Sequence, residues 1–247
     1  MERLLRTLAP FPDDEFLEIG AGAGALTLPL AERARRVVAV EIDPLLAERL
    51  RRAAPANVEV VQGDALKLDL ARFAPPRCRL AGNLPYAVSS PLLRRFLELR
   101  GRVADAHLML QREVAERVAS PPGSRDYGVL SVLYAQWTDV DVPLRFPPGA
   151  FQPPPRVGSA LLRVRFRNAP RTAVSDLEAF ERLVKRAFAS RRKTLENNLR
   201  DSYPNLKQHL RLLGILGSRR AETLSVVEFA RLSESLGSGG SGKGAID

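Results

Sequence analysis

The sequence is poor in residues that form disulfides and bind metals, and it has no long apolar run. Its 247 residues include one cysteine, Cys78, and two histidines, His107 and His209. A lone cysteine excludes an intrachain disulfide and every zinc site built on paired cysteines. A membrane span needs roughly 18 to 20 apolar residues, and neither such a run nor a signal-peptide core is present. We therefore expect a cytoplasmic protein with no bound metal and no membrane partner.

Positive charge, in contrast, is abundant. The 38 Lys and Arg residues outnumber 28 Asp and Glu, which gives a net charge of +10 and a pI near 10.5. Residues 171–236 carry half of this excess, with 13 cationic and 8 acidic side chains. Such a balance favours an anionic partner, nucleic acid above all. A solvated surface of an arginine-rich or thermostable protein is the alternative.

Short apolar runs alternate with helical patterns over most of the chain. The expected strands are residues 16–19, 36–40, 58–61, 79–81, 106–110, 139–142 and 160–166, and the expected helices are 25–34, 44–53, 90–99, 112–119 and 127–137. Asp43 and Pro44 suit the N-cap and first position of the second helix. Because strands that alternate with helices form parallel sheets, the pattern predicts an α/β protein with a Rossmann-like sheet.

The pattern becomes wholly helical from about residue 173. Before that point, residues 146–155 hold five prolines and predict a shaped loop instead of a helix or a strand. The glycine- and serine-rich end of the chain is typical of a flexible tail. We therefore expect a sheet domain over residues 1–170, a small all-α domain over 171–236 and a tail over 237–247.

A glycine-rich turn follows the first expected strand. Glu18 precedes Gly20, Ala21, Gly22 and Gly24 in the pattern Glu-x-Gly-x-Gly-x-Gly. Glycines at such a place let the backbone turn tightly and approach a ligand closely. Gly20, Gly22 and Ala25 also satisfy the dinucleotide-binding pattern G-x-G-x-x-G/A, so this motif alone leaves an NAD enzyme open.

Acidic residues follow the next two expected strands. Glu41 ends the second strand, where a carboxylate can accept hydrogen bonds from the ribose hydroxyls of an adenosine-containing ligand. Asp64 comes just after the third strand and can accept from the exocyclic amino group of an adenine. Ligands bind at the carboxyl ends of parallel strands, so we expect Glu18, Glu41 and Asp64 to line one crevice.

The segment Asn83-Leu-Pro-Tyr86 follows the fourth strand, at the same expected edge of the sheet. An aromatic amine is a poor nucleophile because its lone pair is delocalised into the ring, and two acceptors on its N–H groups favour a pyramidal nitrogen. Asn83 Oδ1 and a backbone carbonyl beside Pro85 can supply them. Tyr86 can stack on the base, which contributes about 1 to 3 kcal/mol. The alternative is a tight turn with a buried tyrosine.

These motifs, in this order and spacing, resemble S-adenosylmethionine-dependent adenine N6-methyltransferases. Longer segments are similar to the KsgA family of small-subunit rRNA adenine N6,N6-dimethyltransferases. The segments that carry this second resemblance are residues 109–117, 127–131, 147–157, 159–160 and 188–199, the last of which contains the block Arg-Arg-Lys-Thr-Leu. The resemblance runs from about residue 16 to residue 236.

The resemblance implies a function and a set of site residues. It implies a monomer that uses S-adenosyl-L-methionine to dimethylate N6 of two adjacent adenosines in the 3′-terminal hairpin loop of 16S rRNA, within the immature 30S subunit. The residues implied to bind the cofactor are Glu18, Gly20, Ala21, Gly22, Gly24, Glu41, Ile42, Asp64, Ala65 and Asn83. The residues implied to hold the target adenine are Asn83, Leu84, Pro85, Tyr86 and Phe151.

A cationic stretch in the expected helical domain suits the phosphates of rRNA. It consists of Lys185, Arg186, Arg191, Arg192 and Lys193. Contacts of this kind position a protein on RNA and do not read its bases. A solvated helix face is the alternative.

Other functions stay open on sequence grounds. An erythromycin-resistance type 23S rRNA methyltransferase shares the Asn-Leu-Pro-Tyr pocket, although the proline-rich loop and the Arg-Arg-Lys-Thr-Leu block favour the KsgA family. A DNA or protein-glutamine methyltransferase more often has proline where this chain has Leu84. KsgA proteins usually carry a Gly-Gln-Asn-Phe-Leu-type motif before the first strand, and this sequence contains none. A non-catalytic assembly factor that binds immature small subunits is therefore a further alternative.

Overall fold

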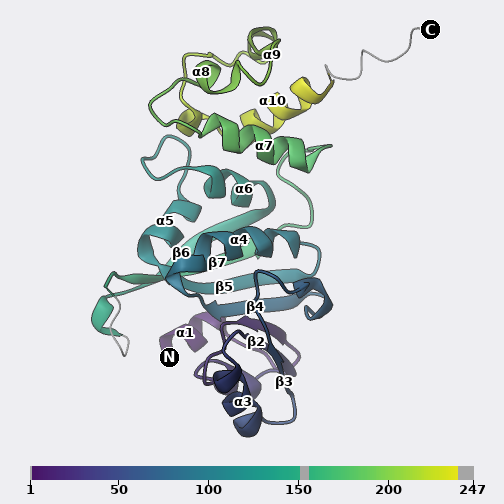
Figure 1. Cartoon of the computed structure of the whole chain (residues 1–247), viewed down its shortest axis with the longest axis vertical. Helices are drawn as coiled ribbons and strands as arrows, with labels where there is room; N and C mark the ends of the chain where they lie inside the picture. The colour runs from purple at the N-terminus through teal and green to yellow at the C-terminus, as the bar shows by residue number, and fades with distance from the viewer. Residues whose placement is uncertain (1, 151–155, 239–247) are drawn as a thin grey trace, which may run out of the picture. The chain divides into compact units, whose positions relative to one another are not determined.

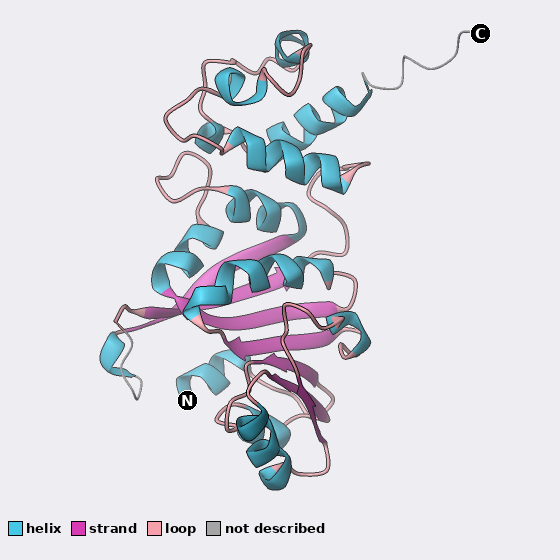
Figure 2. Cartoon of the chain, viewed as in Figure 1, coloured by secondary structure: helices cyan, strands magenta, loops and turns pink. Residues whose placement is uncertain are grey.

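The computed structural model describes residues 2–150 and 156–238 (Figure 1). Their contacts divide the chain into two units, one formed by residues 1–119 and 139–168 and the other by 120–138 and 169–247. The first unit contains the sheet and the second is helical (Figure 2). In the described part of the chain, no helix combines the length and the apolar character that crossing a membrane requires.

A single seven-stranded sheet organises the first unit, in the order β3-β2-β1-β4-β5-β7-β6. Its strands are β1 (Glu15–Ile19), β2 (Arg36–Glu41), β3 (Val58–Gln62), β4 (Cys78–Asn83), β5 (Val103–Gln111), β6 (Thr138–Phe146) and β7 (Ser159–Phe166). Strands β1 to β5 pair in parallel, and β7 pairs antiparallel to β5. The strand order reverses between β1 and β4, which is where such sheets bind ligands. The expected Rossmann-like α/β fold is confirmed.

Five helices cover this sheet: α1 (Glu2–Leu8), α2 (Thr27–Ala31), α3 (Pro44–Ala53), α4 (Ser89–Glu98) and α5 (Arg112–Ala119). Leu4 and Leu8 of α1 and Leu30 of α2 share one buried cluster with Phe16 and Val37 of the sheet. The α4 helix lies in front of the strands in Figure 2. As expected, Asp43 is the N-cap of α3 and accepts hydrogen bonds from two backbone N–H groups of its first turn.

The α1 helix was not predicted from the sequence, and Arg79 of β4 holds its end. The Arg79 guanidinium donates to the carbonyl oxygens of Leu8 and Ala9 at 2.7 and 3.2 Å. It also pairs with Asp14 at 2.7 Å and with Asp105 of β5 at 3.0 Å. A cation at the carboxyl end of a helix is favourable because the last carbonyls lack partners within the helix. Arg79 thereby ties α1 to the sheet beside which the site is built.

The second unit is a bundle formed by α6 (Val129–Trp137), α7 (Leu177–Ala187), α8 (Leu195–Leu199), α9 (Leu206–Leu212) and α10 (Val226–Ser238). Its apolar centre includes three aromatic rings. The ring of Phe188 lies 6.0 Å from that of Tyr127 and 5.9 Å from that of Phe229, measured between centroids. Helix α10 continues to Ser238, so it includes the first residues of the expected tail over 237–247.

The division into units differs from the expected one at residues 120–138. These residues group with the helical unit, whereas a sheet domain over 1–170 was expected. Contacts to later parts of the chain explain the difference, because Gly123 N–H donates to Glu222 O at 2.7 Å and Gln136 Nε2 donates to Thr172 O at 2.5 Å. Such pairings over long sequence distances are invisible to hydrophobic periodicity. The later boundary, at 168/169, lies within two residues of the expected position.

Candidate active site

The parallel strands bring the predicted site residues to one edge of the sheet. β1 pairs with β2 on one side and with β4 on the other, and β2 pairs with β3. Because parallel strands end at the same edge, the segments after Ile19, Glu41, Gln62 and Asn83 follow neighbouring strand ends. The residues expected to bind a cofactor and a target base therefore share this edge.

The turn after β1 requires glycine at three places. Gly20, Gly22 and Gly24 have φ angles of 76°, 58° and 93°, in the left-handed region that other residues avoid. The N–H groups of Gly20 and Ala21 donate to Val40 O at 2.9 and 3.2 Å, which fixes the turn beside β2. A Cβ atom on Gly20 would lie 3.4 Å from the backbone oxygen of Asn83. The turn therefore runs close to the segment proposed to hold the base.

Glu41 holds this turn with its carboxylate. The side chain is only 6% exposed. Its Oε2 accepts the N–H of Gly22 at 2.7 Å, and its Oε1 accepts the N–H of Asp43 at 2.9 Å. A carboxylate oxygen has more than one acceptor site, so each atom can take a further hydrogen bond from a hydroxyl group. Glu41 is thus suited both to shape the turn and to bind a ribose.

Glu18 is the most perturbed acid of the site. It is 2% exposed, and its Oε2 has no hydrogen-bond partner among the described residues. Burial raises the pKa of its carboxyl group to about 8; the nearby Glu41 carboxylate adds to the shift and the Thr27 hydroxyl opposes part of it. Glu18 also lines a cavity. A buried, unpaired polar atom that faces a cavity is a position where a ligand group is expected.

We expect Glu18→Gln to change how stability depends on pH. The carboxyl titrates near 4.5 in the unfolded chain and near 8 in the folded protein, so the folded state binds the extra proton in between. The free energy of unfolding of the wild-type protein therefore loses at most about 1.4 kcal/mol per pH unit as pH rises through this window. Denaturation at several pH values should show that the free energy of unfolding of the variant increases relative to that of the wild type as pH rises. A difference in the free energy of unfolding between variant and wild type that stays constant with pH would contradict this expectation. The same pH dependence in Glu48→Gln, on the exposed face of α3, would also contradict it.

The cavity beside Glu18 joins the glycine turn to Asn83. Its volume is about 390 Å³, and all of its lining residues belong to the first unit. The predicted site residues among them are Glu18, Gly20, Ala21, Gly22 and Asn83. Gly24, Glu41, Ile42, Asp64 and Ala65 are not among its described lining residues. The cavity thus brings together five of the ten residues expected to bind the cofactor, and one of the five, Asn83, is also the first residue of the expected target pocket.

The cofactor candidates outside the cavity lie in three different settings. Gly24 is packed, since a Cβ there would lie 2.7 Å from Leu50 Cδ1. Ile42 is 60% exposed. Asp64 Oδ1 accepts the N–H of Leu66 at 2.9 Å, and Ala65 next to it is half-buried. Gly24 is thereby explained by packing, whereas Ile42 and Asp64 keep accessible surface for a ligand.

The segment Asn83–Tyr86 is held by its neighbours while Asn83 stays exposed. Leu84 is buried, and its N–H donates to Met109 O at 3.0 Å. Pro85 O accepts the hydroxyl of Ser89 at 3.0 Å, and the hydroxyls of Tyr86 and Ser159 are 2.7 Å apart. Tyr86 is half-buried, and its hydrogen bond with Ser159 anchors its hydroxyl end. Phe151, the second expected stacking residue, lies outside the described residues.

Sequence reasoning missed seven described residues that line the same cavity: Leu4, Ala23, Ala25, Leu26, Met109, Phe146 and Ala150. Leu4 belongs to the unpredicted helix α1, and its spacing to Leu8 is the one signal that was available. Phe146 is the last residue of β6, and Met109 lies close to the end of β5. Their place in the cavity depends on the sheet order, which no local pattern states.

The cationic stretch of the helical unit is partly engaged in internal contacts. Arg186 donates to the Ser202 hydroxyl and Lys185 lies 3.4 Å from a Glu181 oxygen. Arg191 donates to the carbonyl of Arg125 and lies 3.2 Å from a Glu222 oxygen. Arg192 and Lys193 are exposed and have no side-chain hydrogen bond or ion pair to any residue that the structure describes.

Comparison with known proteins places this chain in one family. Residues 1–237 match the family described as ribosomal RNA adenine dimethylase, and the chain belongs to that family. A ribosomal RNA small subunit methyltransferase A from Geobacter metallireducens is 46% identical over 91% of this chain and 86% of its own length. The protein of the same name from Xylella fastidiosa (strain 9a5c) is 41% identical over 94% and 89%.

Two solved structures share the fold over nearly the whole chain. The 23S rRNA methyltransferase ErmE has a TM-score of 0.71 and 29% identity, covering 95% of this chain and 96% of its own. A dimethyladenosine transferase from Plasmodium falciparum has a TM-score of 0.75 and 24% identity, covering 94% and 92%. The second of these supports the fold alone. Both cover the helical unit as well as the sheet.

Proposed function

We propose that this chain, acting as a monomer in the cytoplasm, dimethylates N6 of two adjacent adenosines in the 3′-terminal hairpin loop of 16S rRNA within immature 30S subunits. The observation that carries the proposal is the cavity that joins the Glu18–Gly22 turn to Asn83 in a member of the adenine dimethylase family. Relatives at 40–46% identity are named for the small subunit. This favours 16S rRNA over the 23S substrate named for ErmE, which is 29% identical.

The residues of the turn fit S-adenosyl-L-methionine. When bound, this cofactor supplies an electrophilic methyl group on a sulfonium sulfur. The unpaired Oε2 of Glu18 and the close-lying backbone of Gly20 and Gly22 suit its polar, cationic end. Glu41 has acceptor sites left for ribose hydroxyls, and Asp64 Oδ2 can accept from the adenine amino group. We propose that these residues, with Ala21, Ile42, Ala65 and Asn83 around them, hold the cofactor, and that Gly24 supports the turn through its close packing against Leu50.

The chemistry that the chain itself supplies is orientation of the target amine. Asn83 Oδ1 accepts one N–H of the adenine N6 group, and a carbonyl beside Pro85 accepts the other. These acceptors draw the nitrogen out of conjugation and aim its lone pair at the cavity that Asn83 shares with Glu18. Tyr86, anchored through Ser159, stacks on the base. The adenosine is extruded because N6 is otherwise buried in pairing and stacking.

No side chain needs to act as a general base. The methylated nitrogen is a strong acid while it carries its extra proton, and it loses that proton to water. Rate enhancement then comes mainly from alignment of the amine. The same geometry accepts the mono-methylated product for a second transfer, because one N–H remains for Asn83.

The substrate is tested by transfer of labelled methyl groups to isolated ribosomal subunits. The proposal predicts label in small subunits that lack adenine dimethylation, and background label in fully methylated small subunits and in large subunits. Label in large subunits would favour the Erm-like alternative. Tight binding to immature small subunits without transfer would favour a binding-only assembly factor.

The helical unit is proposed to contact rRNA phosphates through Arg192 and Lys193, with Lys185, Arg186 and Arg191 nearby. We expect Arg192→Gln/Lys193→Gln to weaken small-subunit binding and to reduce the slope of log K against log salt by roughly 0.7 for each phosphate that the variant no longer neutralises. Arg51→Gln/Arg52→Gln, which removes two exposed charges from α3, is the matched control. A slope that changes equally in both variants, or in neither, would place the RNA surface elsewhere.

A further inference from the structure

A second cavity of the first unit is lined by three arginines. Its volume is about 480 Å³, and Arg112, Arg145 and Arg156 contribute its positive charge. Arg112 begins α5, Arg145 lies near the end of β6, and Arg156 lies just before β7. We call this cavity the arginine pocket. Arg112 and Arg156 fall in segments that carry the family resemblance, but neither has a role in the site described above.

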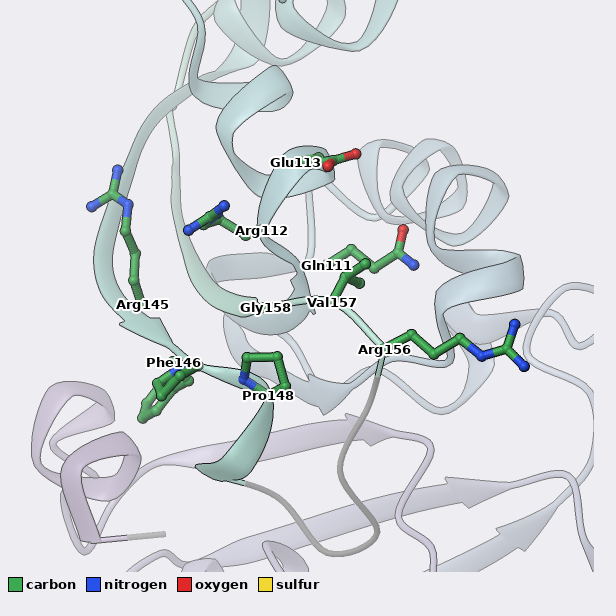
Figure 3. A pocket seen from close by; sticks show the side chains of 10 residues that line it. Gln111, Arg112, Glu113, Arg145, Phe146, Pro148, Arg156, Val157 and Gly158 are labelled. Carbon is green, nitrogen blue, oxygen red and sulfur yellow. The ribbon is translucent and has the colours of Figure 1, made fainter.

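The three side chains occupy two opposite sides of the arginine pocket. Figure 3 shows Arg112 extending toward the side on which Arg145 lies, whereas Arg156 extends to the opposite side. Arg145 is held by Glu116, with Nε and Oε1 2.8 Å apart. Arg112 and Arg156 are exposed, and neither side chain has a hydrogen bond or ion pair to another described residue. Charges spread across the pocket suit an extended polyanion better than a single small anion.

One acidic residue also lines the arginine pocket. Glu113 is the second residue of α5, and Figure 3 shows its carboxylate directed away from Arg112 and Arg145. The lining therefore carries three cations and one anion. Glu116, which pairs with Arg145, adds a second negative charge beside the pocket. The pocket keeps a net positive charge in either case.

The arginine pocket lies next to the proposed target site. Phe146 lines both this pocket and the cavity that contains Asn83. Gln111, on the wall of the pocket, pairs in register with Ser159, whose hydroxyl lies 2.7 Å from that of Tyr86. The phosphates that flank a nucleotide lie one sugar away from its base. A base placed against Tyr86 therefore brings its own backbone within reach of the arginines.

We propose that the arginine pocket binds the RNA backbone next to the extruded adenosine, through Arg112 and Arg156 on its two sides. This inference rests on the proposed function. Phosphate contacts of this kind fix the register of the strand without reading bases, so the pocket positions the target nucleotide for Asn83. Arginine suits the role because its guanidinium binds phosphate through two parallel hydrogen bonds. Arg112 and Arg156 are thus positioning residues within the sheet unit.

The test compares two charge-matched double variants. Arg112→Gln/Arg156→Gln empties the arginine pocket of its free cations. Arg77→Gln/Arg102→Gln removes two exposed arginines that directly precede β4 and β5, and so lie at the opposite edge of the sheet. Thermal unfolding of both variants checks that they remain folded. Arg112→Lys/Arg156→Lys keeps the charges without the paired hydrogen bonds.

Binding to small subunits is measured over a range of salt, separately from single-turnover methyl transfer and from S-adenosylmethionine affinity. For Arg112→Gln/Arg156→Gln we expect unchanged cofactor affinity, subunit binding weakened about tenfold and a salt slope smaller by roughly 0.7 for each phosphate left without its arginine. The lysine variant should keep the slope, and the opposite-edge variant should match the wild type. Equal slope changes in both glutamine variants, or none in either, would overturn the inference. If the wild-type protein binds subunits without transferring methyl groups, the proposed function is refuted. The salt slopes would still show whether the arginine pocket binds the RNA backbone.

Discussion

Asn83→Ala is expected to lose methyl transfer by at least about a hundredfold, a loss much larger than its loss of S-adenosylmethionine affinity. We base this factor on the loss of rate that enzymes typically show when one positioned hydrogen-bonding group at the reacting atom is removed. The exposed Asn83 side chain lies at the end of β4, where it lines the cavity without serving the core. Removing it therefore deletes an acceptor for the adenine amine and leaves the sheet intact. Single-turnover transfer and cofactor titration on the same preparation measure both quantities.

A conservative variant at Asn83 distinguishes the loss of an acceptor oxygen from damage to the fold. Asn83→Asp keeps an acceptor oxygen at the same place, so its rate should lie between those of the wild type and Asn83→Ala. Thermal unfolding of all three proteins should agree closely. Near-normal turnover by Asn83→Ala, or equal loss in both variants, would remove Asn83 from the target pocket.

Glu41→Gln is expected to weaken S-adenosylmethionine binding by about tenfold or more. The two carboxylate oxygens accept the N–H groups of Gly22 and Asp43, and a glutamine has one acceptor oxygen and an NH2 group in their place. One of the two backbone donors is then left facing a donor, which costs about 1 to 3 kcal/mol. The glycine turn loses its anchor, and the ribose loses a charged acceptor. Calorimetric titration with the cofactor measures the loss.

The control for Glu41 is Glu48→Gln, on the same strand-helix unit. Glu48 is exposed on α3 and pairs with Arg51 and Arg52. Exposed ion pairs of this kind contribute little, so this variant should bind the cofactor as the wild type does. Cofactor affinity of Glu41→Gln within about twofold of the control would show that Glu41 neither shapes the turn nor touches the ribose.

The fold was largely predictable because its signals are local. The N-cap at Asp43, the glycines at the end of β1 and the helix over 112–119 each reflect a preference of a few neighbouring residues. Helix α1 was not predictable because seven residues hold little periodicity, and its position depends on Arg79, more than 70 residues away. The grouping of residues 120–138 with the helical unit depends in the same way on contacts that sequence spacing does not reveal.

The site was predictable where one motif follows one strand. Glu18, the glycine turn and Asn83 meet in one cavity, because each lies at or next to the carboxyl end of a parallel strand. The role of Glu41 in holding Gly22 was not foreseen, since it depends on how the turn folds back over β2. The sequence does not single out Arg112 and Arg156, because arginines are common in this chain and only the arrangement of β5, β6 and β7 brings these two to one cavity.

The adenine N6 dimethylation proposed for this chain is tested most directly by nucleoside analysis of small-subunit rRNA after reaction with S-adenosylmethionine and the purified chain. The subunits should lack adenine dimethylation beforehand, and Asn83→Ala serves as the matched inactive protein. We expect N6,N6-dimethyladenosine in the wild-type reaction and close to none with the variant. Methyl groups on another atom or another base, or equal product from both proteins, would contradict the claim that Asn83 presents the adenine N6 to the cofactor.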